Sequence, residues 1–300
     1  MMFSWLLLAL ASAIILCFIP FGERALRNIS LSMSTVAAVL GGYVVVELWK
    51  TNQAFGYADM WWSSASTVTA LILVLASSLL IQCVAYQRFA KEHLEGPLSL
   101  PRLRLHLSAL HGMTLAAIMT SMANNLWIAL AGIFISVIVM VLATDMTKRK
   151  IIALFGVALL FVGIALGFMR GGVLDWDNLT FSNLLSAPMY AEWAVRAAWG
   201  GALLVLGALA GFAPFGSVFT NATQSASIIL RASARSVLVI ASTVTFLRLT
   251  FVTNIAFGSM STGNVLLAVG LFSAVWAIVT LWQNDSNAMD ARFAFLAACT

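Results

Sequence analysis

The sequence predicts an all-α polytopic membrane protein, and three observations support this fold class. Of the 300 residues, 62% are hydrophobic and only 9% are charged, whereas about 25% of the residues in a soluble domain are charged. Several apolar runs reach the roughly 18 to 20 residues with which a helix crosses the hydrocarbon core of a bilayer. The arginines and lysines lie mainly between these runs, as the positive-inside bias produces. These observations exclude a soluble globular protein. The net charge of +5 therefore does not indicate binding to nucleic acid.

Hydropathy divides the chain into about nine transmembrane helices within a single domain, 1–300. The expected spans are 3–20, 30–48, 66–86, 107–122, 124–143, 151–169, 194–213, 236–256 and 264–283. The segment 216–235 is left undecided. Each span satisfies its backbone hydrogen bonds internally, as lipid requires, and no alternating pattern of barrel strands competes with this interpretation.

Loop charge predicts the orientation of the chain. Basic loops at 24–27, 88–104 and 148–150 alternate with neutral or acidic loops. The positive-inside bias places the basic loops in the cytoplasm and the N-terminus outside it, in what we expect to be a bacterial inner (plasma) membrane. The first 20 residues lack a basic start, so we expect a first membrane helix and not a removed signal.

Two connections are longer than turns. The inner one, 82–106, mixes charge with two prolines and suits contact with a cytoplasmic partner. The outer one, 170–193, is acidic and is interpreted as a short re-entrant or interfacial stretch. Neither is long enough to form a soluble domain. The partners we expect are the lipid bilayer, other membrane subunits and a cytoplasmic subunit.

Catalytic, metal and cofactor motifs are missing from the sequence. Cys17, Cys83 and Cys299 have no metal-type spacing, and their odd number argues against a disulfide framework. His106 and His111 are five residues apart, which does not place them on one helix face as paired haem ligands would be. We therefore expect no catalytic residue, no metal, no cofactor and no enzymatic activity of its own.

Ionisable residues in or beside the spans are the candidates for function, because charge inside a membrane is costly. These candidates for an ion path are His111, Arg231, Arg235 and Arg248. The structural alternatives stay open: arginines also anchor helices at the interface or bind carbonyls, and His111 also suits a hydrogen-bonded packing role. Pro214, after a long apolar run, predicts either a broken helix of the kind that lines transporter cavities or a simple kink or helix end.

Three stretches, Ser121 to Ser136, Thr147 to Gly172 and Leu203 to Ala222, resemble one membrane-protein family in the same order. The family comprises the antiporter-like proton-channel subunits of respiratory complex I, group 4 hydrogenases and Mrp-type cation/proton antiporters. It also includes the membrane subunit of DAB-type inorganic-carbon transporters. The resemblance covers about 86–300 and is most specific around Pro214.

The resemblance implies a proton path that this chain lacks in part. Phe134 stands where the family has a glutamate, Leu209 where it has a lysine and Gly216 where it has a histidine. Lys148 lies close to the place of another lysine of the path, although it also belongs to a basic loop. The family continues into a second, inverted repeat, so the chain resembles roughly its first half.

Three functional hypotheses follow. The first is a non-conducting, antiporter-like subunit that anchors or scaffolds a larger ion-translocating or redox complex. The second is a transporter of protons, cations or inorganic carbon in which arginine or histidine replaces the family's glutamate and lysine. The third is a quinone-facing or haem-bearing anchor of a redox enzyme, which an optical spectrum would detect.

Overall fold

The computed structural model describes residues 2–51, 54–55, 60–62, 64–94, 99–143, 148–172, 174, 178–186, 191–210, 228–257 and 260–282. Two compact units make up the chain. One comprises Met1–Ala123, Ala131–Met146 and Ser225–Ala241, and the other comprises Asn124–Leu130, Thr147–Gln224 and Ser242–Thr300. Each unit is described below by itself.

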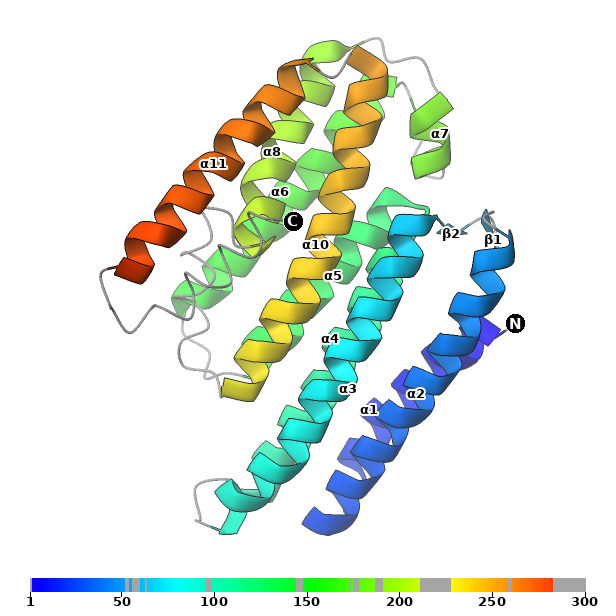
Figure 1. Cartoon of the computed structure of the whole chain (residues 1–300), viewed down its shortest axis with the longest axis vertical. Coiled ribbons are helices and arrows are strands. Elements are labelled where there is room, and N and C mark those ends of the chain that lie inside the picture. Colours follow the sequence, from blue (N-terminus) through cyan, green and yellow to red (C-terminus); the bar gives the residue numbers. More distant parts are fainter. Residues whose placement is uncertain are drawn as a thin grey trace. The chain divides into compact units, whose positions relative to one another are not determined.

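Helices account for nearly all of the described residues (Figure 1). Their bounds are α1 Met2–Phe18, α2 Glu23–Thr51, α3 Ala65–Leu94, α4 Leu100–Met122, α5 Leu126–Leu142, α6 Lys148–Gly172, α7 Phe181–Ser186, α8 Glu192–Ala210, α10 Ile228–Phe257 and α11 Met260–Trp282. Five of these helices, α2, α3, α6, α8 and α10, are long and apolar enough to cross a membrane, and shorter apolar stretches occupy α1, α5 and α11. With α4, they make nine long helices in the described ranges, which confirms an all-α polytopic membrane protein.

Two strands of two residues each form a short hairpin in the described part of the chain. Strands β1 (Ala54–Phe55) and β2 (Trp61–Trp62) are antiparallel, with Ala54 opposite Trp62 and Phe55 opposite Trp61. The Trp61 ring also meets the ring of Phe3 edge-on, with centroids 5.0 Å apart. The hairpin thus ties the connection after α2 to the beginning of α1.

The helices extend further than hydropathy predicted. The expected inner loop 82–106 is wrong for most of its length, because α3 continues to Leu94 and α4 begins at Leu100. Likewise α2 begins at Glu23 and α10 at Ile228. Hydropathy detects the part of a helix that lies in hydrocarbon, whereas helical hydrogen bonding continues into the headgroup region, where charged side chains are hydrated.

In the first unit, α4 packs against α1, α2 and α3, and α2 also packs against α1 and α3. The burial of α4 indicates its central position in this unit, because 15 of its 23 residues are buried. These buried residues include histidine, serine and threonine as well as apolar side chains. Polar side chains on α4 therefore face neighbouring helices and not lipid.

In the second unit, α6 and α8 pack through small residues. A Cβ atom placed on Gly167 would lie 2.6 Å from Ala198 Cβ and 3.0 Å from the carbonyl oxygen of Ala194. At the end of this crossing, the Ala191 amide donates to the Gly171 carbonyl at 3.3 Å. Small side chains let helix backbones approach closely in lipid, where packing and hydrogen bonds replace the hydrophobic effect.

Candidate functional site in helices α2, α3 and α4

A buried hydrogen-bonded cluster joins the three helices inside the first unit. Ser30 of α2 donates to Gln82 Oε1 of α3 at 3.2 Å. The same hydroxyl lies 2.8 Å from Nε2 of His111 on α4. The exposed fractions of Ser30, Gln82 and His111 are 1%, 2% and 0%. We call these three residues the polar cluster.

The donor and acceptor roles in the polar cluster depend on the tautomer of His111. A serine hydroxyl has one proton, and if Ser30 gives it to Gln82 then His111 must donate through Nε2–H. Nδ1 then carries a lone pair, and it has no hydrogen-bond partner among the described residues. The same is true of Nε2 of Gln82, a donor. The polar cluster thus holds one unused acceptor and one unused donor at a buried position, which is costly unless something uses them.

Two further hydroxyls continue the polar cluster along the same helices. Ser78 and Thr114 are hydrogen-bonded at 2.7 Å, one helical turn from Gln82 and His111 respectively. Thr114 also donates to the carbonyl of Leu110, at 2.9 Å. Ser34, one turn from Ser30, is buried with its hydroxyl unpaired among the described residues. A line of polar groups therefore follows the α2, α3 and α4 contact.

Charged groups gather beyond the other end of this line. Arg27 forms an ion pair with Glu23, with Nε and Oε1 2.7 Å apart. It also donates to the carbonyl of Tyr86 at 2.8 Å, and its guanidinium lies 5.0 Å from the centre of the Tyr86 ring. His106 stacks on Phe89, with ring centroids 5.8 Å apart. The polar line thus runs from an ionic end into the apolar interior of the unit.

The chemistry available to the polar cluster is limited by its residue types. Among the described side chains that are buried, His111 is the one that carries a basic group, and Cys17 is a buried thiol on α1. Hydroxyl and amide groups accept and donate hydrogen bonds but do not change charge near neutral pH. No group of three or more metal-ligating side chains occurs among the described residues. The cluster can orient and hydrogen-bond, and His111 is its one titratable member.

The other predicted ion-path residues lie on α6 and α10, outside the three helices of the polar cluster. Arg231 and Arg235 occupy the first turns of α10, four residues apart and therefore on one face, whereas Arg248 lies further along α10. The guanidinium of Arg248 lies 5.1 Å from the centre of the Phe181 ring of α7. Lys148 is the first residue of α6, and its side chain lies outside the described residues, as does Pro214 with the expected break.

The outer connection contains an element that the sequence indicated only as interfacial. Asn125 Oδ1 accepts from the Trp127 amide at 2.8 Å, capping α5, as expected for asparagine in a turn. The Asn124 carbonyl accepts from the Phe181 amide at 2.7 Å, and its side chain bonds Ser182. These bonds hold the short helix α7 against the start of α5.

Ser30 and Gln82 were not among the residues singled out from the sequence, because only ionisable groups were considered. Gln82 carries a usable signal, since it is an amide inside the apolar run LLIQCV, and a buried amide needs partners. Ser30 carries no such signal, because serine is common in membrane helices, where its hydroxyl can donate a hydrogen bond to a backbone carbonyl of the same helix.

Comparison with known proteins relates the fold to two respiratory complexes. No protein-family model and no curated protein match the chain. The chain is similar to a chain of respiratory complex I from Thermus thermophilus with bound aureothin, with a TM-score of 0.69, 15% identity and coverage of 99% of this chain and 62% of that one. It is also similar to a chain of the membrane-bound sulfane sulfur reductase, an archaeal respiratory membrane complex, with a TM-score of 0.70, 13% identity and coverage of 99% and 61%. The chain thus spans about three fifths of the length of these structures, and the resemblance inferred from its sequence is confirmed as a shared fold.

Proposed function

We propose that the protein is a non-conducting membrane subunit that anchors or scaffolds a larger ion-translocating or redox complex. The observation that carries the proposal is the residue type at the positions where the resembled family needs titratable groups. Phe134 and Leu209 occupy two of these positions, in α5 and α8, and neither side chain can bind a proton. Leu209 is buried, with 6% of its surface exposed.

A proton relay through a membrane requires several titratable groups close enough to exchange protons, with pKa values shifted by burial and by each other. The described interior offers His111, bonded to a serine and next to a glutamine. The described arginines keep their protons in proteins, so they stabilise anions more readily than they relay protons. This composition supports a structural role better than a conducting one.

The proposed partners are other membrane subunits, since the fold is shared with chains of multi-subunit respiratory assemblies. A cytoplasmic subunit is the second proposed partner. Arg88 and Lys91 near the end of α3 are exposed, so they can meet an acidic surface. The predicted orientation would place this surface in the cytoplasm.

Flux and copurification together test the proposal. We expect proteoliposomes of the purified chain, loaded with a pH-sensitive dye, to take up protons no faster than empty vesicles after a pH jump. We also expect the chain, extracted from native membranes in mild detergent, to migrate with stoichiometric partners. Protein-dependent proton flux, or a chain that is recovered alone, would contradict a non-conducting scaffold.

A transporter is the second candidate, and the polar cluster is the observation that favours it. His111 Nδ1 and Gln82 Nε2 are buried polar atoms without partners among the described residues, and polar groups in a membrane often mark a transport path. Under this hypothesis, flux is lost in His111→Leu, or in Arg231→Ala and Arg235→Ala. Arg88→Ala, an exposed arginine on α3, is the matched control and should retain flux.

A further inference from the structure

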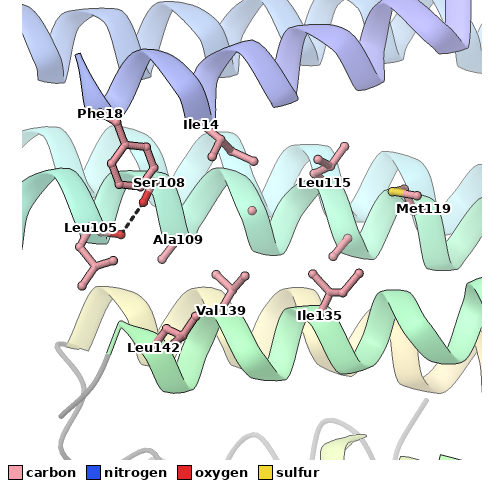
Figure 2. A pocket seen from close by; sticks show the side chains of 12 residues that line it. Ile14, Phe18, Leu105, Ser108, Ala109, Leu115, Met119, Ile135, Val139 and Leu142 are labelled. Carbon is pink, nitrogen blue, oxygen red and sulfur yellow. Dashed lines mark hydrogen bonds between the residues drawn. The ribbon is translucent and has the colours of Figure 1, made fainter. Parts of the chain in front are cut away.

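An apolar groove runs between α1, α4 and α5 in the first unit, away from the polar cluster. Its volume is about 320 Å³. Figure 2 shows its side chains: Ile14 and Phe18 come from α1, Ile135, Val139 and Leu142 come from α5, and α4 lies between them. The groove exists because α4 presents small residues here. These floor residues are Ser108, Ala109, Gly112 and Ala116.

The groove opens to the surface, and its polar atoms are satisfied internally. Phe18, Ile135 and Leu142 at its rim are 60%, 46% and 53% exposed, whereas Ala109 on its floor is 3% exposed. The hydroxyl of Ser108 donates to the Leu105 carbonyl at 2.9 Å, so it offers little to a polar ligand. The groove therefore favours a hydrocarbon chain, because water would find no polar partners there.

An arginine, Arg102, lies beyond one end of the groove. One face of α4 carries residues spaced by three, four or seven positions, which are Arg102, Leu105, Ala109, Gly112 and Met119. The guanidinium of Arg102 is exposed and stands one turn before the first lining residue. The charge therefore lies in line with the groove, on the side of the basic helix ends.

The dimensions fit one acyl chain. Leu105 and Met119 are 14 residues apart on α4, about 21 Å at the helical rise of about 1.5 Å per residue. One leaflet contributes about half of a hydrocarbon core of about 30 Å. The groove is therefore longer than one leaflet, and a phospholipid with its phosphate at the level of Arg102 can lay an acyl chain along the part of the groove that begins at Leu105.

We propose that this groove is a binding site for an anionic phospholipid, with one acyl chain between α1, α4 and α5 and the phosphate on Arg102. The apolar lining selects a hydrocarbon chain, and Arg102 selects a negative headgroup. A basic residue near the membrane surface favours an anionic over a neutral headgroup by about fivefold. The bound lipid fills the space that the small residues of α4 leave between the three helices.

Native mass spectrometry of the purified full chain tests the site. The protein is mixed in detergent with phosphatidylglycerol and phosphatidylcholine of identical acyl chains. We expect the wild type to retain phosphatidylglycerol about fivefold more than phosphatidylcholine. Arg102→Ala should lose this preference. Arg88→Ala, which removes the same charge from an exposed position on α3, should keep it.

A second pair of variants separates the acyl-chain site from the headgroup. Ala109→Leu fills the floor of the groove and should abolish retention of both lipids, whereas Ala76→Leu, at an exposed position on α3, should not. If Ala109→Leu does not fold, Gly112→Ala narrows the same groove, since its methyl would meet Val139 Cγ1 at 3.4 Å. Equal retention in Ala109→Leu and Ala76→Leu, an unchanged preference in Arg102→Ala, or displacement of phospholipid by a neutral isoprenoid would overturn the proposal.

Discussion

The contact between α6 and α8 provides a sharp test, because two glycines one turn apart on α6 have opposite surroundings. Gly167 faces α8, where a Cβ atom would lie 2.6 Å from Ala198 Cβ and 3.0 Å from the Ala194 carbonyl oxygen. Gly163 has no neighbouring atom within 4 Å of the same Cβ position. The substitutions Gly167→Ala and Gly163→Ala therefore add the same methyl group to a crowded and to an open site.

The expected free energies follow from two terms. Replacing glycine by alanine inside a helix is favourable by up to about 1 kcal/mol, and this term is common to both variants. Carbon atoms pack at about 3.5 to 4.0 Å, so the methyl at position 167 must push α8 away by about 1 Å. Overpacking of this kind costs about 1 to 3 kcal/mol. Gly167→Ala should thus be about 1 to 3 kcal/mol less stable than Gly163→Ala, which should equal or exceed the wild type.

Unfolding of the detergent-solubilised protein with increasing denaturant, followed by helical circular dichroism, measures this difference. A third variant, Gly167→Ala with Ala198→Gly, removes the closer of the two clashing atoms and should recover part of the loss. Equal stability of Gly167→Ala and Gly163→Ala would refute the reasoning, because α6 and α8 would then not be in contact at Gly167.

Three further substitutions test individual contacts by the same measurement. Asn125→Ala removes the cap on the Trp127 amide and should cost about 1 kcal/mol. Trp199→Phe removes the indole N–H that donates to Thr250 Oγ1 at 3.0 Å between α8 and α10, and should cost about 1 kcal/mol while the ring packing is kept. Glu192→Gln removes an ion pair whose side chains are about half exposed, and should change stability by less than about 0.5 kcal/mol.

The fold class could be predicted from the sequence because it depends on composition. A chain with so few charged residues is suited to lipid and not to water. Apolar runs long enough for the bilayer predicted the helices. The ends of α2, α3, α4 and α10 could not be placed by hydropathy, because a helix does not stop where the hydrocarbon stops. The extra turns lie in the headgroup region, where charged side chains are hydrated and hydropathy gives no signal for a helix.

The candidate site was predictable only in part. His111 was identified because an ionisable group inside a membrane helix is expensive and therefore rare. Its partner Ser30 lies 81 residues away along the chain, and Gln82, which accepts from Ser30, lies 52 residues from Ser30. Only the packing of α2, α3 and α4 brings the three side chains together. Arg231, Arg235 and Arg248 remain predictions as ion-path residues, as does a break at Pro214.

Helix α4 links these observations. It is absent from the five helices recognisable as spans by length and composition, yet most of its residues are buried. In a membrane the solvent is apolar, so a helix with several polar side chains gains from an interior position, where Ser30 of α2 pairs His111 and Ser78 of α3 pairs Thr114. One face of α4 holds the polar cluster, and another presents the small residues of the lipid groove. The single helix α4 therefore provides both candidate sites in this unit.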